Sequence, residues 1–231
     1  MTSPDALDNI QYEAGEPVSQ SKSKSKTSKA KKNDIKILNS MESTEISDYL
    51  FSILKKSKKE LSAVEIEALT PPADSLVSFF SENSSNLFEC VNKNFCDITN
   101  LKRDFKLKIL ILSSSAIRAT ELIRQLGNLR QTLGVGKCFA KHFKIEDQLK
   151  FFDANRPAIS IGTPNRIAKL FSAEHKYFDM SSVKLCIIDT HRDVKQRSIF
   201  EIPETCSDLL DFYINFVAPS LKSGVTKLVF F

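Results

Sequence analysis

The sequence predicts an α/β fold whose parallel β-sheet is covered by helices on both faces. Several short runs are apolar on both faces, among them residues 107–112 and 183–188, which is typical of strands in a buried parallel sheet. These runs alternate with segments of helical periodicity, as in strand–helix–strand units, whose crossovers we expect to be right-handed. The chain of 231 residues is long enough for one core of ordinary size and a tail.

Residues 1–34 differ from the remainder because they contain few large apolar side chains. Residues 21–32 are mostly serine and lysine and form a strongly basic run of low complexity. Such a tail cannot bury enough apolar surface to offset its chain entropy, so we predict that residues 1–34 are disordered. A lysine run can direct nuclear import or attract phosphate groups, and it can also be a solubilising tail without a specific partner.

Residues 35–104 are expected to form a helical segment that packs on the core. Apolar residues recur at helical spacing over residues 46–54. Ser62 and Glu65 form a capping-box pattern, in which each side chain accepts a hydrogen bond from the other residue's backbone N–H. Pro71 and the proline after it cannot continue that helix. Two apolar clusters that follow are expected to form further short helices: residues 76–80 and 87–95.

Residues 105–231 are expected to form the sheet domain itself. Apolar runs predict its strands, and Gly134 and Gly136 are expected to end its first helix. The expected strands or extended pieces cover residues 107–112, 137–143, 158–161, 183–188 and 226–231, and the expected helices cover residues 116–133, 145–154, a segment that begins at Pro164, and 206–221.

The transition from strand to helix over residues 158–166 is the most informative stretch. Thr163 can cap the helix, because its hydroxyl can accept a backbone N–H, and Pro164 suits the first helical position. The free N–H groups at the start of this helix lie beside Arg166, whose side chain can face solvent there. A helix N-terminus next to a cation is a ready site for a phosphate group. A plain strand-to-helix turn with a solvated arginine is the alternative.

Composition and charge exclude several classes of protein. The net charge of +5 makes the chain mildly basic, which does not by itself establish nucleic-acid binding. No apolar run reaches membrane-spanning length and the N-terminus lacks a secretory-type apolar core, so we expect an intracellular protein. The five cysteines are scattered and form no Cys-x-x-Cys pair, which predicts reduced, mostly buried thiols and no metal site.

The sequence lacks the machinery of a nucleotide hydrolase. Such an enzyme needs a phosphate loop of the pattern Gly-x-x-x-x-Gly-Lys-[Ser/Thr], and the nearest stretch, residues 134–137, has the wrong spacing and precedes a strand. Without that loop nothing cradles the β- and γ-phosphates, and Mg²⁺ loses a ligand. A Ser-His-Asp arrangement can be drawn around His142, His175 or His191, but the nucleophile-elbow pattern is missing. We therefore expect a protein that is not an enzyme, with no catalytic residue and no cofactor.

Ligands bind at the C-terminal ends of the strands in such sheets, so the residues that follow each strand matter most. Three of the four strand ends inspected carry cations or turns that can hold phosphate. The residues that follow all four strands are Ser113, Ser114, Ser115 and Arg118 after the first strand, Lys141, His142 and Lys144 after the second, Thr163, Pro164 and Arg166 after the third, and Asp189, Thr190, His191, Arg192 and Asp193 after the fourth.

These strand ends resemble the first RecA-like domain of DEAD-box RNA helicases. Residues 162–166, Gly-Thr-Pro-Asn-Arg, resemble the family's Thr-Pro-Gly-Arg element, and residues 185–189 resemble the strand that leads into the Asp-Glu-Ala-Asp box. Residues 114–118 fall where the family has Pro-Thr-Arg-Glu-Leu, and residues 227–231 are similar to the strand before its Ser-Ala-Thr element. The resemblance covers roughly residues 105–231 and implies an incomplete RecA-like sheet.

The departures from the helicase pattern lie at positions that handle ATP. Thr190 stands in place of the glutamate that positions the attacking water, and Arg192 stands in place of the second aspartate. The phosphate loop and the whole second RecA-like domain are missing. The resemblance thus implies a degenerate helicase domain that keeps its RNA-facing elements and has lost its ATP-facing elements.

A lysine-rich tail, a helical segment and a truncated helicase-like sheet together resemble the Cms-type family of eukaryotic nuclear proteins. The Lys141-His142-Phe143-Lys144 turn and the phenylalanine ending are also similar to that family. The family is associated with the small-subunit processome, the early pre-ribosome, and has a genetic link to DNA replication. The resemblance implies a role in small ribosomal subunit biogenesis and rRNA processing, in the nucleus and there in the nucleolus. Pre-ribosomal RNA and processome proteins would be its partners, with no membrane and no small-molecule substrate.

The matching helicase elements imply which residues contact the RNA backbone. The expected RNA-binding residues are Arg118, Lys141, Lys144, Thr163, Asn165 and Arg166. Contacts of this kind position a protein on RNA and carry little sequence information. Two other functions stay open, namely a purely protein-binding nuclear scaffold linked to DNA replication or cell-cycle control, and an atypical nucleotide hydrolase.

Overall fold

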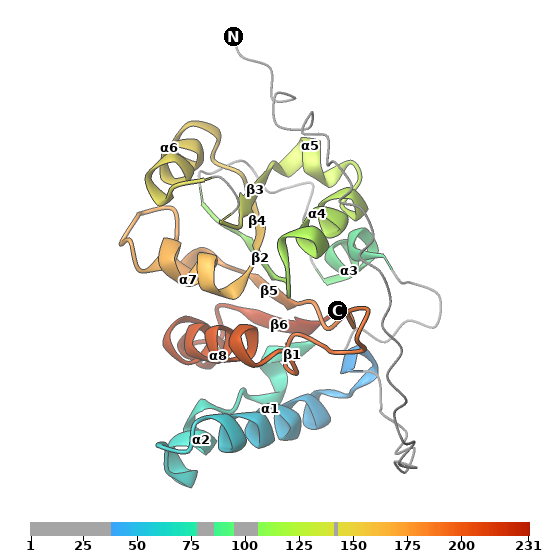
Figure 1. Ribbon diagram of the computed structural model, residues 1–231, viewed down its shortest axis with the longest axis vertical. Coiled ribbons are helices and arrows are strands. Elements are labelled where there is room, and N and C mark those ends of the chain that lie inside the picture. Colours follow the sequence, from blue (N-terminus) through green and yellow to red (C-terminus); the bar gives the residue numbers. More distant parts are fainter. Residues whose placement is uncertain (1–37, 78–85, 95–105, 141–142) are drawn as a thin grey trace, which may run out of the picture. The chain divides into compact units, whose positions relative to one another are not determined.

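The structure is a computed structural model that describes residues 38–77, 86–94, 106–140 and 143–231. The predicted disordered tail over residues 1–34 lies outside these ranges. The described residues are built on a six-stranded sheet in the order β1-β6-β5-β2-β4-β3, and every neighbouring pair is parallel (Figure 1). This confirms the predicted α/β class and is consistent with an incomplete RecA-like sheet. The strands are β1 (Leu76–Val77), β2 (Ile109–Leu112), β3 (Val135–Cys138), β4 (Ile159–Gly162), β5 (Leu185–Ile188) and β6 (Lys227–Phe230).

Helices cover both faces of the sheet and enclose two apolar cores. One face carries α1 (Ser43–Ser57), α2 (Ala63–Leu69), α6 (Ile145–Asn155), α7 (Pro164–Phe171), α8 (Pro203–Phe212) and α9 (Ala218–Lys222). The other face carries α3 (Leu87–Asn94), α4 (Ala116–Gln125) and α5 (Leu129–Leu133), which lie together on one side of the strands in Figure 1.

The strands are apolar on both faces because both faces are buried. In β2 the side chains alternate between the cores, so that Leu110 and Leu112 join the core under α6, α7 and α8. Ile109 and Ile111 join the core under α3, α4 and α5. All four side chains are completely buried. A solvated face would show alternating polar residues, and their absence from β2 is the signal that predicted a covered parallel sheet.

Local capping chemistry sets several helix boundaries as predicted. Both reciprocal hydrogen bonds of the capping box at the start of α2 are present, from the Glu65 backbone N to Ser62 Oγ at 3.3 Å and from the Ser62 backbone N to Glu65 Oε2 at 2.8 Å. The Ser62 hydroxyl also donates to Glu65 Oε2, at 2.7 Å, and this hydrogen bond together with that from the Ser62 backbone N holds the pKa of Glu65 below its ordinary value. Helix α7 begins at Pro164, and α3 and α6 occupy the predicted segments.

Two predicted helices are wrong in part. Residues 76–80 were expected to be helical, but Leu76 and Val77 form β1, which pairs with β6 at one side of the sheet. Residues 78–80 lie outside the described ranges. The helix expected over residues 116–133 is two helices, α4 and α5, because Gly127 adopts the left-handed conformation with φ +51° between them. Glycine enters this region without a Cβ clash, so the chain can turn there.

The segment expected to be extended over residues 137–143 also begins earlier than predicted. Gly134 ends α5 with φ +69°, as expected, but Gly136 lies inside β3. A Cβ at Gly136 would stand 2.0 Å from the Phe152 ring, so glycine lets α6 lie close against β3. The C-terminal helix begins at Pro203, earlier than expected, and contains a π-helical turn, Tyr213–Val217, between α8 and α9. Among the helices of the described ranges, none is long and apolar enough to cross a membrane.

Candidate functional site

The C-terminal ends of the parallel strands meet at one edge of the sheet, which we call the carboxyl edge. Strands β2, β4 and β5 run in full register, with Leu112 beside both Gly162 and Ile188. The next residues continue the ladder, because the backbone N of Ser113 donates to Gly162 O at 2.8 Å and that of Asp189 donates to Leu112 O at 2.9 Å. Ser113, Thr163 and Asp189 therefore lie side by side, where the sequence predicted a site.

Asp189 and Arg118 form a buried ion pair at this edge. Arg118 Nε donates to Asp189 Oδ2 and Arg118 Nη2 donates to Asp189 Oδ1, both at 3.0 Å. The Asp189 side chain is completely buried and that of Arg118 is 14% exposed. Burial alone would lower the pKa of the Arg118 guanidinium, but the hydrogen bonds and charges of Asp189, and after it of Glu121, together outweigh burial and raise it. The carboxylate of Asp189 is thus paired with a cation of the protein itself.

Helix α4 presents Arg118 to that carboxylate. Ser115 caps the helix, since its hydroxyl accepts the Arg118 backbone N–H at 3.1 Å. The remaining guanidinium nitrogen, Nη1, donates to Glu121 Oε2 at 3.3 Å on the exposed side of the same helix. All three guanidinium nitrogens therefore have carboxylate partners in this structure. Arg118, predicted to contact RNA, has its charge balanced by Asp189 and Glu121.

Thr190 and Arg192, which depart from the helicase pattern, both hold the chain in place. The Thr190 backbone N and Oγ1 both donate to the Phe231 carbonyl, at 2.7 Å and 2.8 Å, and this ties the end of β5 to the end of β6. Arg192 Nη1 donates to Glu201 Oε2 at 3.1 Å and to the Gln196 carbonyl.

Arg166 is buried, which contradicts the expectation that its side chain faces solvent. The residue is 8% exposed. Its Nε donates to Gln148 Oε1 at 2.6 Å, and its Nη2 donates to the Phe143 carbonyl just before α6. Gln148 Nε2 in turn donates to the carbonyls of Lys137 and Phe139 at the end of β3. The arginine and the glutamine together fasten both ends of the connection between β3 and α6.

The other predicted residues differ in their surroundings. Thr163 occupies the N-cap position of α7, as expected, but its side chain makes no capping hydrogen bond. Asn165 is exposed and its Nδ2 donates to Asp208 Oδ1 at 3.2 Å on α8. Lys144 is exposed at the N-cap position of α6, and Lys141 lies outside the described residues. Of the six predicted residues, the structure therefore shows Lys144 and Asn165 as exposed.

Sequence reasoning missed Gln148 and Phe231. Gln148 lies one helical turn before Phe152 on the buried face of α6, so a glutamine at an apolar position of the helix was the available signal. No sequence pattern marks the Phe231 carbonyl as the acceptor for Thr190, because any residue supplies a carbonyl.

The cysteines of the described ranges match the prediction of buried thiols. Cys90, Cys138, Cys186 and Cys206 are free and buried. Complete burial raises the pKa of Cys138 and Cys186 to about 12, so both are protonated and unreactive at neutral pH. Within the same ranges, no group of His, Cys, Asp and Glu side chains is arranged to hold a metal ion.

Comparison with known proteins identifies relatives along most of the chain. A family model, CMS1, described as "U3-containing 90S pre-ribosomal complex subunit", matches residues 8–231. Protein CMSS1 of Danio rerio is 34% identical over 124 residues, which are 53% of this chain and 42% of that protein. Protein CMSS1 of Xenopus laevis is 31% identical over 186 residues, which are 78% of this chain and 65% of that protein. Protein CMS1 of Chaetomium thermophilum is 29% identical over 171 residues, which are 73% of this chain and 62% of that protein. The matched parts thus span 42% to 65% of the length of these relatives.

Proposed function

The chain belongs to the CMS1 family, and from this membership we propose that it is a subunit of the 90S pre-ribosomal complex that binds RNA and protein without catalysis. The observation that carries the proposal is the family match over residues 8–231, which includes all of the described sheet. A subunit of such a particle would work in the nucleus, and there in the nucleolus, during small-subunit assembly and rRNA processing.

The carboxyl edge supports a role without nucleotide hydrolysis. The carboxylate of Asp189 is completely buried and both of its oxygens accept hydrogen bonds from Arg118. A bound magnesium ion needs carboxylate oxygens that it can reach, and here an internal cation occupies that place. The residues that follow β1, 78–85, contain neither glycine nor lysine, so the sequence there does not supply a phosphate loop. We propose that the domain is a degenerate helicase domain on these grounds.

We also propose the three-part organisation of tail over 1–34, helical segment over 35–104 and RecA-like domain over 105–231. Strand β1 is the one strand that the segment over residues 35–104, the middle segment, contributes to the described sheet. Helix α1 packs on the same core as α7 and α8. The middle segment is therefore joined to the sheet domain through shared hydrophobic burial.

For contact with the RNA backbone we propose Lys144 and Asn165, together with Thr163 and with Lys141, which lies outside the described residues. Lys144 follows β3 and precedes α6, so its exposed ammonium group stands free of the core. We do not propose Arg118 and Arg166 as direct RNA contacts, because acceptors within the protein bind their guanidinium groups. They would maintain the shape of the surface that the other residues present.

Crosslinking in cells tests the proposed function. Ultraviolet crosslinking of the tagged full chain, followed by sequencing of the attached RNA, should recover pre-ribosomal RNA or the U3 RNA named in the family description. Recovery of neither RNA, with normal recovery of processome proteins, would favour a purely protein-binding scaffold. Magnesium-dependent, RNA-stimulated ATP turnover by the purified chain would favour the hydrolase instead.

Replacement of Lys144 by alanine is expected to weaken binding of a single-stranded RNA without loss of stability. One phosphate contact contributes a slope of about −0.7 to log K against log salt, so the variant should show a salt dependence shallower by about that amount. The Lys144 side chain makes no capping hydrogen bond, so the melting temperature should not change. Fluorescence anisotropy at several salt concentrations measures the slope, and Lys59→Ala, an exposed lysine after α1, is the matched control. Equal slopes in wild type and both variants would remove Lys144 from the interface.

A further inference from the structure

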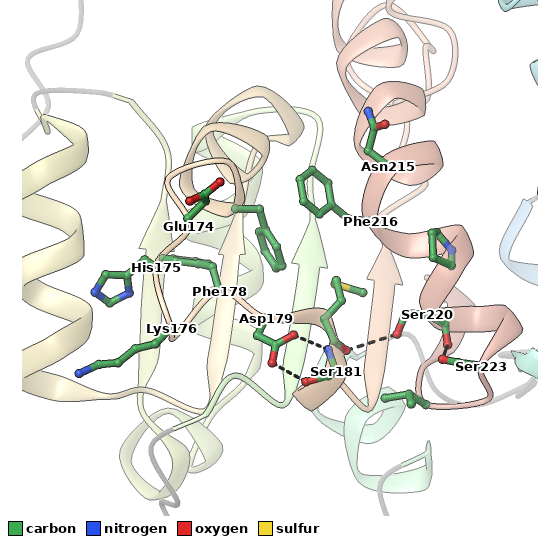
Figure 2. A pocket seen from close by; sticks show the side chains of 14 residues that line it. Glu174, His175, Lys176, Phe178, Asp179, Ser181, Asn215, Phe216, Ser220 and Ser223 are labelled. Atoms are coloured by element: carbon green, nitrogen blue, oxygen red, sulfur yellow. Dashed lines mark hydrogen bonds between the residues drawn. The ribbon is translucent and has the colours of Figure 1, made fainter.

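A hollow of about 730 Å³ opens at the opposite edge of the sheet from the carboxyl edge. Its walls come from the C-terminal end of α7, from residues 174–181 before β5, and from the π-helical turn and α9 before β6 (Figure 2). Met180–Ser182 form a short 3₁₀ turn that leads into β5, which places the hollow where β5 and β6 begin. Nothing in the proposed RNA interface uses this region.

Three phenylalanines give the hollow a firm apolar lining. The ring centroids of Phe171 and Phe178 are 5.4 Å apart, and those of Phe171 and Phe216 are also 5.4 Å apart. Phe171 and Phe178 are buried, whereas Phe216 is only partly buried and so offers ring surface to a ligand. Aromatic side chains that are fixed by packing lose little conformational freedom when they bind a partner, which favours their use as anchors.

The π-helical turn Tyr213–Val217 places two of its residues on the wall of the hollow. Asn215 and Phe216 both line it, and Figure 2 shows their side chains on the same helical stretch above Ser220. One extra residue per turn changes which side chains face the hollow, relative to a regular α-helix. Such turns are rare and are found often at functional sites.

The rim of the hollow is acidic. Glu174 is exposed and has φ +51°, a conformation that non-glycine residues seldom adopt. Asp179 is also exposed, and its carboxylate accepts hydrogen bonds from the backbone N and the hydroxyl of Ser181. Neither carboxylate forms an ion pair with a described residue. Two further side chains at the rim, His175 and Lys176, face Asp153 outside the hollow: His175 Nε2 lies 3.1 Å from Asp153 Oδ2 and Lys176 Nζ lies 3.8 Å from Asp153 Oδ1.

We propose that this hollow is a docking site for a segment of a partner protein that inserts one large apolar side chain and carries a lysine or arginine beside it. The apolar side chain would contact Phe216 and Phe171, and the cation would face Glu174 and Asp179. RNA does not fit this rim, because two unpaired carboxylates repel phosphate groups. The inference rests on the protein-binding part of the proposed function and assigns that part to the edge opposite the proposed RNA contacts.

Selection from a library of random peptides displayed on phage, with the intact chain as bait, tests the proposal. Enriched sequences should combine a large apolar residue with a neighbouring lysine or arginine. Synthetic fluorescent copies of the enriched peptides should then bind the wild-type chain in anisotropy titrations. Acidic consensus sequences, or no enrichment, would overturn the proposal.

Variants locate the bound peptide. Phe216→Ala should weaken binding about thirtyfold, as expected for an aromatic anchor. Glu174→Lys should weaken peptide binding about fivefold at low salt. This variant leaves the aromatic packing intact, so it still tests the docking site if Phe216→Ala unfolds. Glu67→Lys, an exposed charge reversal on α2, is the control that should bind like wild type. Equal binding by Glu174→Lys and Glu67→Lys would place the peptide elsewhere and overturn the proposal.

A single-stranded RNA that displaces the peptide would indicate a nucleic-acid site and would also overturn it. These readouts are independent of crosslinking in cells. A failed peptide selection beside recovered pre-ribosomal RNA therefore removes the docking site alone, and the reverse result removes the RNA-binding role alone.

Discussion

Replacement of Asp189 by alanine is expected to lower the free energy of unfolding by about 3–5 kcal/mol, because it leaves the charge of Arg118 largely buried without its partner. The carboxylate is completely buried and is held by two hydrogen bonds of 3.0 Å. Chemical denaturation, followed by circular dichroism, measures the loss. We expect this change in stability without the loss of any ATP turnover, because the proposed function includes none.

The exposed ion pair between Arg118 and Glu121 provides a control for the buried one between Arg118 and Asp189. Glu121 contacts the same guanidinium group at 3.3 Å but is 48% exposed, so Glu121→Ala should change the free energy of unfolding by less than about 1 kcal/mol. The double variant Arg118→Met, Asp189→Leu removes both charges and should be more stable than Asp189→Ala alone. If Asp189→Ala and Glu121→Ala are equally stable, the buried pair is not a stabilising feature. If Asp189→Ala instead abolishes ATP hydrolysis in a stable protein, the carboxylate serves catalysis.

The sheet could be predicted from the sequence because burial on both faces leaves a direct mark. Residues 109–112 are Ile-Leu-Ile-Leu, and the structure sends alternate side chains into two separate cores. Helix boundaries were predictable where a local group determines them, as at Ser62 and at Pro164. These features depend on residues within one turn of each other, which a sequence displays side by side.

One missed feature of the fold depends on a contact that the local sequence does not display. Leu76 and Val77 are a strand because β6, about 150 residues later in the chain, offers an unpaired neighbour. Gly127 breaks the helix after α4 although the apolar spacing continues through it. The apolar periodicity favours a single helix there, but glycine has a low helix propensity and adopts the left-handed conformation without a Cβ clash, so Gly127 is a local signal that the periodicity outweighed.

The candidate site was predicted in its location but not in its chemistry. Sequence reasoning placed polar and charged residues at the strand ends, and the ends of β2, β4 and β5 do lie together. It could not show that Arg118 turns inward, because its partner Asp189 is 71 residues away. For Arg166 the partner Gln148 is 18 residues away on another helix. A cation near a strand end therefore indicates a polar site, and only the fold decides whether that cation faces a ligand or an internal acceptor.

Replacement of Arg166 by alanine is expected to lower the free energy of unfolding by about 3 kcal/mol. The variant leaves Gln148 Oε1 and the Phe143 carbonyl without their donor in a buried place, and each unsatisfied buried acceptor costs about 1–3 kcal/mol. A solvent-facing arginine that contacts only RNA would instead leave the stability unchanged. Denaturant titration of the free protein therefore separates the two roles without any RNA.

Two further variants sharpen the result. Lys169 is an exposed cation on the same helix, α7, so Lys169→Ala should change the free energy of unfolding by less than about 0.5 kcal/mol. Arg166→Lys keeps the charge but cannot donate from the two separated nitrogens of a guanidinium group, so its stability should fall between wild type and Arg166→Ala. If Arg166→Ala lowers the RNA affinity, Gln148→Ala should lower it as well, because both residues hold in place the connection that presents Lys144. An Arg166→Ala protein of wild-type stability with reduced RNA affinity would instead return this arginine to the interface as a direct phosphate contact.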